Sequence, residues 1–251
     1  MSQFLFIIAL FLLNCLSAYP HNPNVPAEYW IQTEPYFLPK DHPIKAKLDK
    51  IFSKRRVTES TASFEKAGFG KVKLNPKGNL VLGRHRELTG FLVKAFLDEQ
   101  APCCEWYNWI QRIDGANAIR DCIKRNGFKD FVIPKKWIYP LPEKPAPDPS
   151  LGPQRKNFIL IVEDMRISSN DANLKAYKSK ISKKHLEQLF VIIEEVGLLD
   201  SVYPDNIPFT TKGKIAFIDT EHHHHELIPL QILNHFLSPS MQAYWNKLIN
   251  Q

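Results

Sequence analysis

This sequence is poor in cysteine and glycine, with four cysteines and ten glycines among 251 residues. It contains no C-x-x-C pair and no H-E-x-x-H segment, which argues against the common zinc sites. A Walker-type phosphate loop, a dinucleotide fingerprint and a nucleophile elbow are also missing. These absences disfavour an ordinary metalloprotease, P-loop enzyme, dinucleotide-dependent enzyme or α/β-hydrolase.

Basic residues outnumber acidic residues, 33 against 26, and the formal net charge is +7. The basic residues are spread along the chain, without the arginine stripe or aromatic-basic motif of nucleic-acid modules. We therefore expect no nucleic-acid partner, and solubility is a sufficient reason for the charge.

The first 18 residues predict a secretory signal peptide. Residues 4–13 form an apolar run, and small residues follow it up to Ala18. An uncleaved N-terminal anchor is the alternative. We expect a mature chain that begins near Tyr19 and is exported to a periplasmic, extracellular or secretory-lumen compartment, with no later membrane span.

Cleavage would leave Cys103, Cys104 and Cys122. An odd count in an exported protein indicates one bridge and one free thiol, or no bridge. A bridge from Cys103 or Cys104 to Cys122 would link the helical segments between them if the geometry allows it.

The chain after the signal peptide divides into three regions. Residues 19–62 form a Pro-rich extension, irregular over residues 19–40 and helical over residues 44–52. Residues 63–165 predict strands at 71–74, 80–82, 90–96, 131–133, 137–139 and 158–162. They also predict a helix over residues 105–124, broken near Asp114 and Gly115, and an exposed Pro-rich loop at 140–153.

The third region, residues 166–251, predicts a short and mostly helical segment. One helix begins at Ser182 and ends at Gly197, and residues 227–248 are helical with a second start at Ser238. Between them, residues 207–209 and 215–218 predict two strands joined by a Gly-containing turn, so that residues 207–219 form a hairpin.

This hairpin has Asn206 at its entrance and Asp219 at its exit. Both oxygen-bearing side chains emerge at the same end of the hairpin. Together they predict a site for a hard cation such as Mg²⁺.

The Asn-hairpin-Asp pattern, together with the order of strands, helix and strands before it, resembles the protein-kinase family. The resemblance implies an α+β, two-lobed fold, with a small antiparallel sheet plus helix followed by a short, mostly helical lobe. It also implies that Lys94 contacts the phosphates of ATP and that Asn206 and Asp219 hold Mg²⁺.

The sequence departs from that family at several positions. Ser201 stands where the catalytic base is expected, and a serine cannot accept the substrate proton as a carboxylate can. Asp200 is the weak candidate for that role, one residue earlier. The Gly-rich loop is missing, and the helical partner of Lys94 is either Asp114 or Glu105.

Four consecutive histidines, His222, His223, His224 and His225, follow Glu221. Imidazoles beside carboxylates predict binding of zinc, copper or nickel, or a response to acid pH. Because neighbouring side chains on an extended segment point to opposite faces, at most two can converge on one ion. A solvated His-rich loop is the favoured interpretation.

Three functions remain open. The first is an exported pseudokinase-like binding or scaffolding module with a protein partner, with or without retained nucleotide and metal binding. The second is an atypical phosphotransferase that uses Lys94, Asn206 and Asp219, with Asp200 or Glu221 as the base. The third is an exported metal-binding protein that uses the four histidines.

Overall fold

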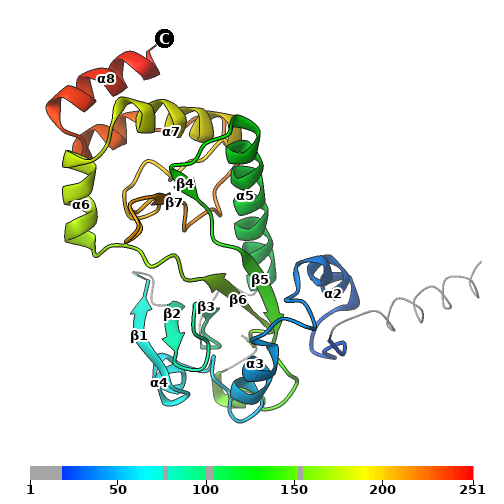
Figure 1. Ribbon diagram of the computed structural model, residues 1–251. Coiled ribbons are helices and arrows are strands. Elements are labelled where there is room, and N and C mark those ends of the chain that lie inside the picture. The colour runs from blue at the N-terminus through cyan, green and yellow to red at the C-terminus, as the bar shows by residue number, and fades with distance from the viewer. Residues whose placement is uncertain (1–18, 76–78, 100–103, 152–154, 251) are drawn as a thin grey trace, which may run out of the picture. The chain divides into compact units, whose positions relative to one another are not determined.

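The computed structural model describes residues 19–75, 79–99, 104–151 and 155–250, and the fold is α+β (Figure 1). The predicted signal peptide and Cys103 lie outside these residues. The chain divides into two compact units. Unit 1 takes the residues up to Tyr107 and Trp137–Val162, and unit 2 takes Asn108–Lys136 and Glu163–Gln251.

Unit 1 is built on a five-stranded sheet with the order β1-β2-β3-β6-β5. The strands β1, β2 and β3 pair antiparallel in sequence order. All the strands predicted in this part of the chain are confirmed, with small changes at their ends. The bounds are β1 (Phe69–Leu74), β2 (Leu80–His85), β3 (Phe91–Phe96), β5 (Lys136–Pro140) and β6 (Phe158–Glu163).

The N-terminal segment of unit 1 is packed, so the prediction of an irregular surface segment over residues 19–40 was wrong. It forms α2 (Ala27–Thr33) and the 3-10 helix η1 (Glu34–Tyr36), and Leu38 N donates to Ile138 O at 2.9 Å. Trp30 and Phe37 are buried and pack edge to face. Burial of these aromatic rings outweighs the local signal of the prolines.

The remaining helices of unit 1 are α3 (Lys45–Phe52), α4 (Thr61–Lys66) and the 3-10 helix η2 (Pro149–Leu151). The predicted helix over residues 44–52 is therefore confirmed, whereas α4 was not predicted.

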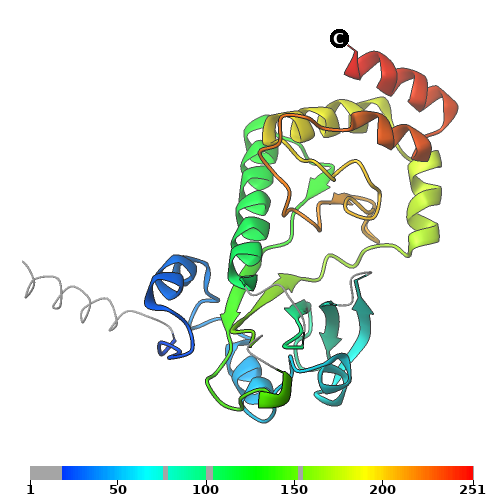
Figure 2. The same cartoon turned by 180° about the vertical axis from the view of Figure 1, so that it is seen from behind.

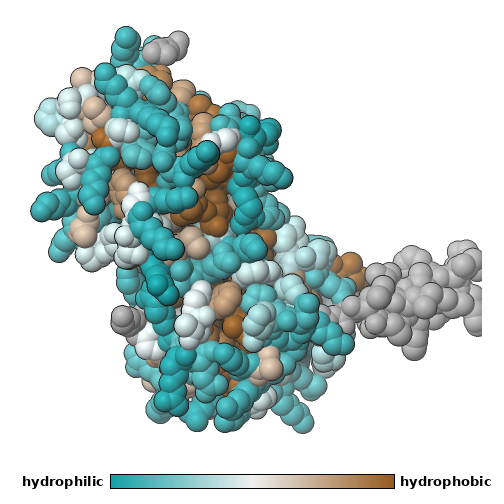
Figure 3. All heavy atoms as spheres, viewed as in Figure 1, coloured by the Kyte–Doolittle hydropathy of each residue, from teal (hydrophilic) through white to brown (hydrophobic). Residues whose placement is uncertain are grey.

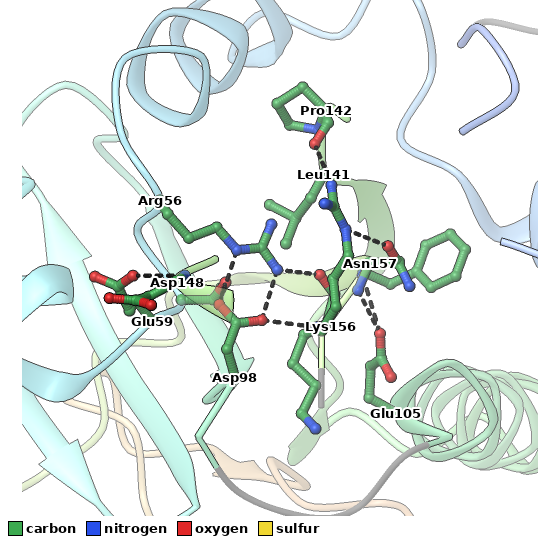
Figure 4. A network of polar contacts seen from close by, with 12 residues as sticks. Arg56, Glu59, Asp98, Glu105, Leu141, Pro142, Asp148, Lys156 and Asn157 are labelled. Atoms are coloured by element: carbon green, nitrogen blue, oxygen red, sulfur yellow. Dashed lines mark hydrogen bonds and ion pairs between the residues drawn. The ribbon is translucent and has the colours of Figure 1, made fainter. Parts of the chain in front are cut away.

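A buried ion pair joins distant segments of unit 1 (Figure 4). Arg56 donates from Nε to Asp98 Oδ2 at 2.8 Å and from Nη2 to Asp98 Oδ1 at 2.6 Å. Asp98 also accepts from Thr58 Oγ1 at 2.9 Å and from Lys156 N at 2.7 Å. Each carboxylate oxygen is thus hydrogen-bonded, as a buried charge requires.

Glu105 forms a second buried contact in unit 1 (Figure 4). Its Oε1 accepts from Asn157 N at 2.6 Å and from Phe158 N at 3.3 Å. Burial raises the pKa of this carboxyl from 4.5 to about 7, although both backbone donors act in the opposite direction.

Unit 2 places helices around a small parallel sheet. Figure 1 and Figure 2 show α5 (Glu105–Asn126), α6 (Asn170–Ser179) and α7 (Lys183–Val196) on three sides of that sheet. The sheet pairs β4 (Phe131–Val132) with β7 (Ile215–Ala216). The chain ends in the 3-10 helix η3 (Leu230–Phe236) and α8 (Pro239–Ile249).

The predicted ends of α7 are confirmed. Ser182 caps the first turn through a capping box with His185, and Gly197 closes the helix at φ 69°. Ser238 precedes α8 as predicted, but the first half of the predicted C-terminal helix is the 3-10 helix η3.

The helix α5 is continuous over 22 residues, so the predicted break near Asp114 and Gly115 was wrong. A Cβ on Gly115 would lie 2.0 Å from Thr220 O. The glycine therefore allows a loop to approach the helix closely and does not interrupt it.

The continuous helix also excludes a bridge between Cys104 and Cys122. Cys104 directly precedes α5 and Cys122 lies near its end. At a rise of ~1.5 Å per residue, about 25 Å of helix separates them. A disulfide requires Cα atoms within ~7 Å. The buried Cys122 donates to Glu195 Oε2 at 3.3 Å.

Within the described ranges, none of the helices combines the length and the hydropathy that crossing a bilayer requires.

Candidate functional site

The predicted hairpin is present in unit 2 as a paired turn, but only Ile215–Ala216 of its two predicted strands is a strand, and Phe209 forms an isolated bridge to Ile215. Thr210 N donates to Lys214 O at 2.7 Å, and Gly213 occupies the turn at φ 80°. Nearer the hairpin base, Ala216 N donates to Pro208 O at 2.9 Å and Ile218 N donates to Asn206 O at 3.0 Å. The backbone of Asn206 is thus paired next to Asp219, and both residues lie at one end of the hairpin as predicted.

The Asn206 side chain holds the preceding turn. Its Nδ2 donates to Asp200 O at 3.0 Å. Asp200 is only partly exposed, and Oδ1 of its carboxyl is buried without a hydrogen-bond partner among the described residues. Burial raises the pKa of Asp200, and the negative charge of Asp219 raises it further, whereas His222 and Arg112 oppose the rise.

Ser201 lies beside Asp200 and is fully buried. In the part of the chain that the structure describes, its Oγ has no hydrogen-bond partner. A buried hydroxyl is a poor proton acceptor, so position 201 offers no general base.

Arg112 contributes the strongest contacts of the site. It lies on α5, and its side chain is 7% exposed. Its Nη1 donates to Asp219 Oδ1 and its Nη2 donates to Glu221 Oε2. One guanidinium therefore bridges the two carboxylates that follow the hairpin, through charge-assisted hydrogen bonds.

A second buried cation supports the same segment. Lys136 Nζ donates to Thr220 Oγ1 at 2.6 Å, and Thr220 Oγ1 donates to Arg112 O at 2.6 Å. Lys136 Nζ also lies 3.4 Å from Arg112 O and from Ile218 O. These contacts hold Thr220, which lies between Asp219 and Glu221, against α5. Gly115 permits this close packing because it has no side chain at the point where Thr220 O approaches the helix.

The resulting cluster balances its own charges. Arg112 and Lys136 provide two cations, and Asp200, Asp219 and Glu221 provide up to three carboxylates. The two cations offset the carboxylates of Asp219 and Glu221, and burial raises the pKa of the Asp200 carboxyl.

As arranged, the cluster does not fit a divalent cation. The two carboxylates nearest the hairpin exit already contact Arg112, which supplies the positive charge that a metal would bring. Among the described residues, no group of three or more His, Cys, Asp or Glu side chains is placed to hold a metal ion. The assignment of Asn206 and Asp219 as Mg²⁺ ligands stays a prediction. Mg²⁺ could bind Asp219 only if the Arg112 guanidinium moved away from it.

Lys94 belongs to unit 1, whereas Asn206, Asp200 and Asp219 belong to unit 2. Lys94 lies on β3 opposite Leu82 of β2 and is partly exposed. Its assignment to ATP phosphates stays a prediction. Of its two predicted helical partners, Glu105 accepts backbone hydrogen bonds in unit 1 and Asp114 lies in unit 2.

The four histidines form a loop against α7. His224 N donates to Val196 O at 2.9 Å and His225 N donates to Gly197 O at 3.0 Å. His223 Nδ1 lies 3.2 Å from Glu221 O, and burial lowers the pKa of the His223 ring. His222 and His225 are exposed, and their rings are 6.1 Å apart.

Sequence reasoning missed Arg112 and Lys136. A signal for Arg112 was available, because it shares a helical stripe with buried Ile119 and with Gly115. A cation on the buried face of an amphipathic helix requires a buried partner. Lys136 is the buried first residue of strand β5 and carries the same kind of signal.

The chain matches no protein-family model, and no curated protein matches it significantly in sequence.

Proposed function

We propose that this protein is a pseudokinase-like module that binds or scaffolds a protein partner and does not transfer phosphate. The order of elements supports this assignment. Three antiparallel strands precede the long helix α5, two further strands complete the sheet, and a mostly helical segment with one hairpin follows. That hairpin lies between Asn206 and Asp219, the positions that the kinase resemblance assigns to metal.

The observation that carries the proposal is the contact of Arg112 with Asp219 and Glu221. In active kinases the helix that follows the third strand contributes a glutamate that pairs with the strand lysine. Here the corresponding helix contributes an arginine to the acidic end of the hairpin. Arg112 neutralises the residue that would otherwise attract a metal-bound nucleotide.

Ser201 supports the same conclusion. Phosphoryl transfer from ATP to a hydroxyl requires a residue that orients the hydroxyl and accepts its proton. A buried serine hydroxyl cannot do so.

The alternative of an atypical phosphotransferase has one observation in its favour. Asp200 is a partly buried carboxyl with a raised pKa, and groups with a perturbed pKa are concentrated at catalytic sites. In that alternative Asp200 accepts the proton, and Lys94, Asn206 and Asp219 hold the nucleotide. It requires Arg112 to leave Asp219.

A phosphate-transfer assay separates these alternatives. Purified protein is incubated with γ-labelled ATP and either Mg²⁺ or Mn²⁺, and both self-labelling and release of phosphate are followed. The proposal expects the wild type to show no more turnover than the Asp219→Asn variant. Turnover that is lost in both Asp219→Asn and Asp200→Asn would overturn it.

A further inference from the structure

Unit 2 contains a cavity of about 600 Å³ that shares no residue with the Arg112 cluster. Its walls come from the C-terminal half of α5, from β4 and the residue after it, from residues 164–166 and from the hairpin turn. The volume lies within the range of ~300–1,000 Å³ that is typical of ligand sites. We call it the basic-rimmed pocket.

The floor of the basic-rimmed pocket is apolar. Ile123, Phe131, Val132 and Ile133 line it, and Phe131 continues into the hydrophobic core of unit 2. Figure 3 shows hydrophobic surface on the face of unit 2 that carries α5 and β4, bordered by hydrophilic side chains. An apolar side chain placed here would be removed from water.

The rim of this pocket is basic. Arg120, Arg166, Lys212 and Lys214 border it, against the single carboxylate of Asp164. Arg166, Lys212 and Lys214 are exposed. Cations gathered beside an apolar floor repel one another, and a ligand with negative charges relieves that repulsion.

Backbone hydrogen bonds hold the rim in place. Thr211 N donates to Arg166 O at 2.9 Å, so the two cationic segments are joined directly. Lys214 N donates to Thr210 Oγ1 at 3.1 Å within the turn. Arg166 itself adopts φ 50°, a left-handed conformation that non-glycine residues rarely take and that recurs at ligand clamps.

The strand β4 lines the pocket and is an edge strand of its sheet. In the two-stranded sheet, β7 also bridges to Phe209, whereas β4 pairs with no further strand among the described residues. An extended peptide can lie along such an edge while its side chains enter adjacent pockets.

We propose that the basic-rimmed pocket binds an acidic peptide segment of a partner protein, with one apolar side chain on the floor and carboxylates at Arg166, Lys212 and Lys214. This inference rests on the part of the proposed function that concerns a protein partner and names the chemistry of that partner, but it does not depend on the Arg112 cluster or on the absence of phosphate transfer.

The test uses fluorescence anisotropy with a labelled decapeptide in which one phenylalanine is flanked by glutamates. A second peptide replaces the phenylalanine with serine, and a third replaces the glutamates with glutamines. We expect saturable binding of the first peptide with a Kd below about 1 mM, and binding at least about tenfold weaker for the other two. Equal binding of the serine peptide would reduce the interaction to charge alone and overturn the proposal.

Two matched variants locate the binding. The double variant Lys212→Glu/Lys214→Glu should weaken peptide binding at least about tenfold, because it reverses two rim charges. The double variant Lys178→Glu/Lys180→Glu changes two exposed lysines at the end of α6 and should stay within about twofold of wild type.

Equal losses in the two double variants would place the binding elsewhere and overturn the proposal, as would no saturable binding to the wild type. If the rim variant unfolds, the wild type alone supplies the test. Its affinity for the glutamate peptide must fall as salt rises from about 0.05 to 0.5 M, and affinity that is insensitive to salt would overturn the proposal.

Discussion

Removing the Arg112 guanidinium should destabilise the protein more than removing any exposed charge. The variant Arg112→Met retains most of the side-chain volume but removes the guanidinium that both Asp219 and Glu221 contact. Breaking a fully buried ion pair costs ~3–5 kcal/mol. The Asp219 and Glu221 side chains are 31% and 20% exposed, so water recovers part of that cost. We expect a loss of about 2–3 kcal/mol in the free energy of unfolding.

Replacing Asp219 and Glu221 by their neutral amides in the same protein should restore most of the lost free energy of unfolding. The triple variant Arg112→Met/Asp219→Asn/Glu221→Gln removes the guanidinium together with the two carboxylates that it contacts, and should lie within about 1 kcal/mol of wild type. Arg120→Met is the matched control on the same helix, where the guanidinium is partly exposed, and should cost about 0.5 kcal/mol.

Urea unfolding followed by circular dichroism measures all four proteins. A buried ion pair at Arg112 is contradicted if Arg112→Met costs no more stability than Arg120→Met, or if the triple variant is as unstable as the single variant.

Three other outcomes are expected. The pKa of Glu105 is raised from 4.5 to about 7 in the folded state, so this group stabilises the fold fully below pH 4.5 and the contribution is lost as pH rises to 7. This difference in pKa corresponds to about 3 kcal/mol in the free energy of unfolding. Glu105→Gln should therefore flatten the curve of stability against pH between pH 4.5 and 7, and an unchanged slope would contradict the raised pKa of Glu105. Gly115→Ala should lower stability by about 1–2 kcal/mol despite its higher helix propensity, because the new Cβ meets Thr220 O; a thermal melt showing stabilisation would contradict that contact. Replacing residues 222–225 by serine should leave zinc binding in calorimetry unchanged, because among the described residues no group of three or more His, Cys, Asp or Glu side chains is placed to hold a metal ion; loss of binding would restore the metal-binding alternative.

Local patterns predicted most of the secondary structure correctly. Short alternating or continuous apolar runs located the strands of unit 1, and the Ser182 and Gly197 caps located α7, because these signals depend on residues close in sequence. The hairpin that ends at Asp219 was predicted for the same reason. Asn206 and Asp219 are brought to one end by the turn between them.

Predictions failed where distant contacts override local preference. Gly115 suggests a helix break, but its role is set by Thr220, a residue more than 100 positions away. Prolines suggest an irregular segment over residues 19–40, but aromatic packing organises it. Arg112 was missed because its two partners lie beyond the hairpin, and only the tertiary fold brings them to α5.

A thermal-shift titration with ATP, in the presence and absence of Mg²⁺, tests directly whether Arg112 takes the place of a metal ion at Asp219. A ligand that binds only the folded state raises the melting temperature with concentration, so even millimolar affinity is detectable. If Arg112 takes the place of the cation at Asp219, Mg²⁺ should add nothing to any shift that ATP produces. A Mg²⁺-dependent rise in the wild type that disappears in a folded Asp219→Ala variant would contradict the account.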